Sequence, residues 1–184
     1  SNPLGIAVTP DGATVYVSEV ADRIRKIDVA TRQVTTVAGV YNGALSCSGS
    51  NCPDGVGTNA RFNNPYGLAL GRGETLLYVA DSASRRIRQI ELSSRTVTTI
   101  AGSGTSAGSA DGTSDSASFD LPNGIASTAD GMLVVITDSN KRTVRQFLPY
   151  AQMPRPPFAP PAPLTPPPLP LPPAPPPSAP GPLV

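Results

Sequence analysis

The sequence predicts an all-β fold of repeated four-stranded units, followed by an extended proline-rich tail. Three observations lead to this fold class. Three segments within residues 1–148 resemble one another, and each contains short β-branched runs separated by turn signals. Residues 149–184 hold 18 of the 23 prolines, and a stretch so rich in proline cannot form hydrogen-bonded sheets or a packed core.

The repeats are evident when the three segments, 2–39, 64–102 and 121–147, are aligned. Each begins with a proline followed by a glycine two residues later, and the prolines Pro3, Pro65 and Pro122 are spaced by 62 and 57 residues. The first two segments end in Val-Thr-Thr-Val-Ala-Gly and Val-Thr-Thr-Ile-Ala-Gly. The third segment has no such ending and runs into Leu-Pro-Tyr instead.

The first segment shows the strands expected of each unit. They cover residues 6–8, 15–17, 24–27 and 34–37, and Asp11-Gly12 supplies a turn between the first two. Four short strands at a period of about 40–60 residues indicate a β-propeller blade. The sequence therefore predicts about three blades, which form an incomplete ring. We expect that either further blades precede residue 1 or another chain completes the ring.

A longer motif then makes a family resemblance specific. Asp-Gly, Ala-x-Phe and Pro-x-Gly-Ile/Leu-Ala follow one another twice, over residues 54–69 and 111–126. This pattern resembles the NHL repeat, whose propellers usually close with about six blades. The resemblance implies an NHL-repeat fragment at 1–148, with blades at about 1–39, 62–102 and 119–148. The positions that define its repeats are Gly5, Gly67, Gly124, Asp81, Asp138, Phe62 and Phe119.

The resemblance also bears on catalysis. Some NHL-type propellers are lyases that use histidines and a metal, but this chain has no histidine. We therefore expect no enzyme activity, no catalytic residues, no metal site and no cofactor. The aspartates of the Asp-Gly pairs, Asp11, Asp54, Asp111 and Asp130 among them, are interpreted as turn-forming residues.

Arginines recur in each unit around the third strand, as Arg23 and Arg25, as Arg86 and Arg88, and as Arg142 and Arg145. Alternation predicts that they lie on a solvated strand face with nearby acidic partners. Some NHL propellers bind RNA through a basic face. Because 14 basic residues are balanced by 13 acidic ones, for a net charge of +1, we expect neither nucleic-acid binding nor membrane insertion.

The two cysteines, Cys47 and Cys52, lie in a Gly/Ser/Asn-rich connection between the first two units. A single pair without histidine does not match a zinc site, so the alternatives are a local disulfide and free thiols. We favour the disulfide, which implies an oxidising compartment.

The tail, residues 149–184, is predicted to form a polyproline II rod because proline fixes φ and restricts the preceding residue. Three interpretations remain open: an inter-domain spacer, a ligand of SH3-like or WW-like domains, and a hydroxyproline-rich shaft. The third rests on resemblance to volvocine algal and plant wall glycoproteins, whose hydroxyprolines carry O-linked arabinose and galactose. The candidate hydroxylation sites are Pro156, Pro157, Pro160, Pro161, Pro163, Pro166, Pro167, Pro168, Pro170, Pro172, Pro173, Pro175, Pro176, Pro177 and Pro180.

Together these features favour an extracellular structural glycoprotein of a filament, coat or wall, such as the mastigonemes of algal flagella. The propeller would be an interaction head and the rod a glycosylated shaft. Expected partners are other chains of the same assembly, in a homo-oligomer or fibre, and glycans. The alternative is a secreted propeller that binds a peptide or glycan, with the tail as a spacer.

Overall fold

A computed structural model describes residues 2–41, 47, 51–114 and 116–148. They belong to one compact unit, Ser1–Ala151; the second unit, Gln152–Val184, lies outside the described residues. The predicted polyproline rod and all its candidate hydroxylation sites therefore also lie outside them. Within the described ranges the regular structure is twelve strands and one 3-10 turn, so the predicted all-β class is confirmed.

The first sheet is formed by residues 3–39. Its four strands pair antiparallel in sequence order: β1 (Pro3–Val8), β2 (Thr14–Glu19), β3 (Arg23–Asp28) and β4 (Val34–Gly39). Asp11 forms the first turn as predicted, because its carboxylate accepts hydrogen bonds from Thr9 Oγ1 at 2.6 Å and from the Ala13 amide at 2.9 Å. Gly12 follows with a φ of +71°, a conformation that glycine adopts without strain.

The second sheet repeats this order and adds one strand. Its main strands are β6 (Pro65–Gly71), β7 (Leu76–Asp81), β8 (Arg86–Glu91) and β9 (Thr96–Ala101). The added strand β5 (Gly55–Val56), followed by a 3-10 turn η1 (Gly57–Asn59), pairs with the outer edge of β9. The second blade thus begins at the Asp54-Gly55 pair, upstream of the expected boundary near residue 62.

The third sheet has three strands, β10 (Pro122–Ser127), β11 (Val134–Asp138) and β12 (Thr143–Phe147). Its first turn repeats that of the first sheet, since the Asp130 carboxylate accepts hydrogen bonds from Thr128 Oγ1 at 2.5 Å and from the Met132 amide at 2.9 Å. The position that the fourth strand occupies in the other two sheets has no strand among the described residues.

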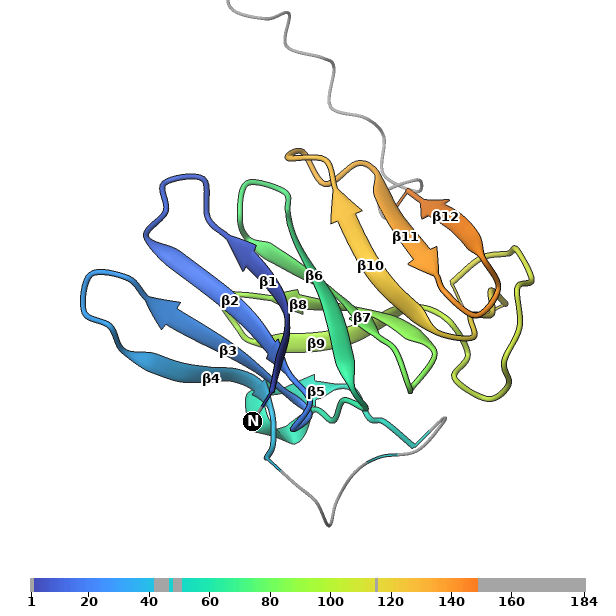
Figure 1. Ribbon diagram of the computed structural model, residues 1–184, viewed down its shortest axis with the longest axis horizontal. Helices are drawn as coiled ribbons and strands as arrows, with labels where there is room; N and C mark the ends of the chain where they lie inside the picture. Colours follow the sequence, from blue (N-terminus) through green and yellow to red (C-terminus); the bar gives the residue numbers. More distant parts are fainter. Residues whose placement is uncertain (1, 42–46, 48–50, 115, 149–184) are drawn as a thin grey trace, which may run out of the picture. The chain divides into compact units, whose positions relative to one another are not determined.

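The three sheets pack face to face through two apolar clusters. One joins the first and second sheets and includes Tyr16, Ile24, Phe62 and Leu77. The other joins the second and third sheets and includes Tyr78, Ile87, Phe119 and Ile136. The first strand of each sheet lies beside its counterpart in the next, so β1, β6 and β10 are neighbours (Figure 1).

Glycine permits this close approach of neighbouring first strands. A Cβ atom added to Gly5 would lie 2.0 Å from the carbonyl oxygen of Tyr66, and one added to Gly67 would lie 2.3 Å from that of Asn123. The Ser18 hydroxyl bridges the same strands, accepting from the Gly5 amide at 2.8 Å and donating to the Tyr66 carbonyl at 2.5 Å. Backbone therefore packs directly on backbone between blades.

Among the described residues, no helix is long and apolar enough to cross a membrane.

Candidate functional site

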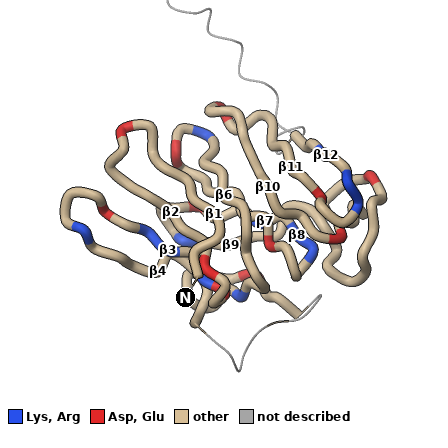
Figure 2. The backbone as a smooth tube through the Cα atoms, in the orientation of Figure 1, with Lys and Arg blue, Asp and Glu red and all other residues tan. Residues whose placement is uncertain are grey.

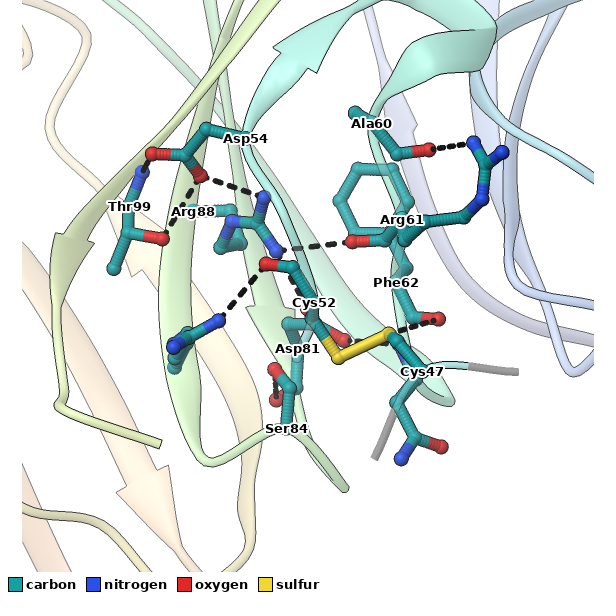
Figure 3. A network of polar contacts seen from close by, with 12 residues as sticks. Cys47, Cys52, Asp54, Ala60, Arg61, Phe62, Asp81, Ser84, Arg88 and Thr99 are labelled. Carbon is teal, nitrogen blue, oxygen red and sulfur yellow. Dashed lines mark hydrogen bonds and ion pairs between the residues drawn. A yellow bond between two sulfur atoms is a disulfide. The ribbon is translucent and has the colours of Figure 1, made fainter. Parts of the chain in front are cut away.

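A buried arginine organises the loop that leads into the second sheet. Arg88 lies on β8, and its side chain is 0% exposed. Its Nη2 lies 2.7 Å from Asp54 Oδ1 and its Nη1 lies 3.1 Å from Asp81 Oδ2 (Figure 3). Two carboxylates from distant segments therefore neutralise one guanidinium in the interior.

The same guanidinium holds the loop backbone and an aromatic ring. Arg88 Nη1 donates to the Arg61 carbonyl and Nη2 donates to the Pro53 carbonyl, both at 3.1 Å. Its central carbon lies 5.3 Å from the centre of the Phe62 ring, within the range of a cation–π contact. The loop from Pro53 to Phe62 is thus fixed at both ends by one side chain.

Asp54 extends this network to the fourth strand. Its Oδ2 accepts the Thr99 amide and its Oδ1 accepts the Thr99 hydroxyl, both at 2.9 Å. The carboxylate therefore links β9 to Arg88 on β8.

The third sheet repeats the arrangement around Arg145, which pairs with β11 as Arg88 pairs with β7. Its Nη2 lies 2.6 Å from Asp111 Oδ1 and donates to the Ala110 carbonyl at 2.9 Å. Its Nη1 donates to the Ser118 carbonyl at 3.1 Å, and its central carbon lies 5.1 Å from the Phe119 ring centre.

The corresponding residue of the first sheet, Arg25, has different surroundings. It lies 3.6 Å from Glu19, and its Nε donates to the Thr35 carbonyl at 3.3 Å. Arg23 pairs with the same Glu19 at 2.7 Å and lies 4.9 Å from the Tyr41 ring centre. Arg25 and Arg23 are thus held within their own sheet and by its outgoing chain.

The aspartate that ends the second strand fixes the residues that follow the phenylalanine. Asp81 accepts the Asn63 amide at 2.8 Å, and Asp138 accepts the Asp120 and Leu121 amides at 2.8 and 2.9 Å. Burial raises the pKa of the Asp81 carboxyl to about 6, and the nearby Arg88 charge and hydrogen bonds offset this only in part.

Cys47 and Cys52 form a disulfide with their Cα atoms 5.0 Å apart, beside the Arg88 network (Figure 3). The Cys47 sulfur lies 3.1 Å from the Phe62 carbonyl oxygen. This is a van der Waals contact and not a hydrogen bond, because a disulfide sulfur carries no proton to donate. The Cys52 carbonyl accepts a hydrogen bond from Arg86 Nη1 at 2.9 Å. The disulfide thus anchors the connecting loop against the second sheet.

Two interpretations of charged residues were wrong. Asp54 and Asp111 were expected to form turns, but they pair with Arg88 and Arg145. Arg88 was expected on a solvated strand face, but the loop folds back over it and buries it. A signal was present: the second arginine of the Arg-x-Arg pair, or its counterpart Arg145, recurs in every unit, whereas the first does not.

Of the other repeat-defining residues, all but Gly124 lie at the contacts between blades. Phe62 and Phe119 are buried in the two clusters, while Gly5 and Gly67 face the next first strand. Gly124 faces its own sheet, where a Cβ atom would lie 2.7 Å from Thr137 Oγ1.

Charged residues are absent from the first strands, Pro3–Val8, Pro65–Gly71 and Pro122–Ser127, and also from the fourth strands, Val34–Gly39 and Thr96–Ala101. Acidic and basic residues interleave in the second and third strands and in the connecting loops (Figure 2). In the described part of the chain, no three His, Cys, Asp or Glu residues gather as a metal site would require. Arg88 and Arg145 act as loop anchors, whereas Arg23 and Arg25 pair with Glu19 in the first sheet.

Three antiparallel sheets packed face to face, joined by Asp-Gly…Phe loops anchored on arginine, have the architecture of β-propeller blades, and the sequence is similar to that of NHL-repeat proteins. NHL repeat-containing protein 2 of Bos taurus is 24% identical over 148 residues, which cover 79% of this chain and 20% of that protein. Its Homo sapiens counterpart is 30% identical over 92 residues, 50% of this chain and 13% of that protein. The chain thus spans a fifth or less of these relatives, and no family model matches it.

Solved structures support the same fold. An auxiliary nutrient binding protein from Bacteroides thetaiotaomicron superposes with a TM-score of 0.64 and 27% identity, over 77% of this chain and 36% of that one. The crystal structure of a nidogen/laminin complex gives a TM-score of 0.55 at 14% identity and shares the fold alone.

Proposed function

We propose that this chain is an extracellular interaction protein, in which the NHL-type domain is the head and the proline-rich tail an O-glycosylated shaft. The observation that carries the proposal is the disulfide between Cys47 and Cys52, both of which are buried. Disulfides that serve structure are made and kept in oxidising compartments and are rare in the cytosol. The proposal places the chain in a cell-surface filament, coat or wall.

The head is proposed to bind other proteins of the same assembly. Homology to NHL-repeat proteins supports a protein-interaction domain. The charge balance is compatible with this role, because 14 basic residues are set against 13 acidic ones and both signs are interspersed along the backbone (Figure 2).

The shaft is proposed from composition, since proline makes up 18 of the 36 residues in 149–184. A polyproline II rod has no internal hydrogen bonds and keeps its backbone and side chains accessible to modifying enzymes. Hydroxylation followed by O-glycosylation would stiffen and solubilise it.

Mass spectrometry of the protein purified from its native source tests this proposal. We expect hydroxyproline carrying pentoses or hexoses between Pro156 and Pro180, and unmodified Pro3, Pro65 and Pro122 as controls inside the domain. Non-reducing peptide mapping should recover Cys47 linked to Cys52. Unmodified tail prolines would contradict the shaft, and free thiols in protein alkylated at the moment of cell lysis would contradict the extracellular location.

A secreted binding module with a plain spacer is the second candidate. The observation that favours it is the structural neighbour at 27% identity, which is an auxiliary nutrient binding protein. This candidate predicts unmodified prolines together with an intact disulfide. It also predicts that a domain ending at residue 148 retains the binding of a peptide or glycan, measured by array screening against the full chain.

A further inference from the structure

The outer strand of the third sheet, β12, has an edge on which no further strand pairs among the described residues. In the first two sheets the third strand pairs with a fourth, β3 with β4 and β8 with β9. Within residues 2–41, 47, 51–114 and 116–148, β12 pairs only with β11. A backbone edge of this kind is a template for strand addition.

The pairing of β8 with β9 shows which residues a strand on β12 would meet. Ile87 lies opposite Ala101, Arg88 opposite Thr99 and Ile90 opposite Val97. Because Arg145 corresponds to Arg88, Val144 corresponds to Ile87 and Phe147 to Ile90. The same register on β12 places alanine at Val144, threonine at Arg145 and an apolar residue at Phe147.

The exposures of the corresponding carboxylates agree with a missing strand. The side chain of Asp54 is 45% exposed, whereas that of Asp111 is 92% exposed although Arg145 fixes one of its oxygens at 2.6 Å. Val144, the counterpart of Ile87, is 71% exposed on the face that in the second sheet packs against the third sheet. A carboxylate oriented toward the edge thus lies where β9 would cover it, next to an exposed apolar side chain.

Asp111 supplies the specificity of this edge. In the second sheet the equivalent carboxylate accepts both the amide and the hydroxyl of Thr99. In the second sheet β5 also pairs with the outer edge of β9, whereas the corresponding residues before the third sheet, Gly112-Thr113, form no strand. Only a residue with a free N–H and a β-hydroxyl satisfies Asp111 in the same manner.

We propose that β12 and Asp111 form a binding site for an extended segment of a partner protein with the pattern apolar-Thr-Thr-apolar-Ala. The segment adds antiparallel to β12, its second threonine binds the Asp111 carboxylate, and its alanine lies opposite Val144. The proposal rests on the proposed function only in assigning an interaction role to the domain; it is independent of the tail and of the compartment.

The test uses a fluorescent peptide with this chain's own fourth-strand sequence, residues 95–102, titrated into the complete 184-residue chain. We expect saturable binding, with new protection of the β12 amides in hydrogen–deuterium exchange. A peptide with Thr99→Val should bind about tenfold or more weakly, because a hydrogen bond to a charged carboxylate is lost. The peptide with Thr98→Val is the matched control and should bind unchanged, since Thr98 is exposed on β9.

Substitutions in the protein, rather than in the peptide, test whether the peptide binds at β12 and Asp111. Val144→Lys replaces an exposed side chain and should abolish binding without affecting the fold, and Asp111→Asn should weaken binding as Thr99→Val does. Asp11→Asn, the same change in an exposed turn, should leave binding intact. The proposal is overturned if no peptide binds below about 1 mM, if both threonine variants bind alike, or if the chain self-associates through Val144. Absent tail modification would overturn the shaft but not this site.

Discussion

Arg88 stacks on Phe62, its guanidinium carbon 5.3 Å from the ring centre, while the same guanidinium pairs with Asp54 and Asp81. One fully buried side chain thereby joins an aromatic residue of the cluster between sheets to two carboxylates. The relationship is repeated by Arg145 and Phe119 at 5.1 Å. It connects the Asp-Gly and Ala-x-Phe parts of the motif to an arginine on the third strand of the same sheet.

Replacing Arg88 by leucine should destabilise the domain by about 3–5 kcal/mol, because the Asp81 carboxylate stays buried without its cation. Urea unfolding followed by circular dichroism measures this loss. Arg145→Leu is the matched control and should cost less, because the partner Asp111 is exposed to water. The double variant Arg88→Leu/Asp81→Asn should recover part of the loss; equal losses for Arg88→Leu and Arg145→Leu would contradict the buried-pair explanation.

The stability of the domain should depend on pH through Asp81. Its pKa is about 6 in the folded state and near 3.8 without burial. The folded state binds more protons between these values, so the unfolding free energy contributed by Asp81 falls as pH rises from about 4 to 6. The full effect is about 3 kcal/mol, from about 1.4 kcal/mol per pKa unit. The unfolding free energy of wild type minus that of Asp81→Asn should fall as pH rises over this range. A rise in this quantity would refute the assignment.

Gly67→Ala should destabilise the contact between the second and third sheets by about 2–3 kcal/mol, because the new methyl group would lie 2.3 Å from the backbone carbonyl of Asn123. Gly124→Ala is the control, since its methyl group would meet the Thr137 hydroxyl, the end of a side chain that can rotate. Thermal unfolding should rank Gly67→Ala clearly below Gly124→Ala. The reverse order would show that the sheets separate easily at this contact.

Removing the disulfide by Cys47→Ala/Cys52→Ala should lower the unfolding free energy by about 2 kcal/mol, as expected for a loop with a sequence separation of 5. Wild type unfolded in urea with a thiol reductant should match the double variant, which should itself be insensitive to the reductant. If reduction leaves the wild-type midpoint unchanged, the disulfide does not constrain the unfolded chain.

The fold was predictable because each blade repeats simple local signals. β-branched runs of the kind seen at 34–37 predict strands, and Asp11-Gly12 predicts a turn by a purely local hydrogen bond. These features depend on residues within a few positions, so periodicity and turn chemistry are sufficient to find them.

The site was less predictable because it depends on contacts distant in sequence. Asp54 and Arg88 are separated by 34 residues, and an arginine at alternate strand positions has the same local pattern whether solvent or a loop covers it. The strand β5 was missed because Gly55-Val56 is too short to show alternation. Aligning the arginines across the units could have indicated Arg88, but not its burial.

The loop from Pro53 to Phe62 precedes the second blade, yet the arginine that holds it lies on the third strand of that same blade. The shortest stretch that contains the complete second blade, its incoming loop and the arginine that holds this loop is therefore 53–102, not the four main strands alone. Gene duplication or protein engineering that cuts before Pro53 would transfer the blade together with the loop that Arg88 holds. A cut between Phe62 and Pro65 would instead separate this loop from Arg88.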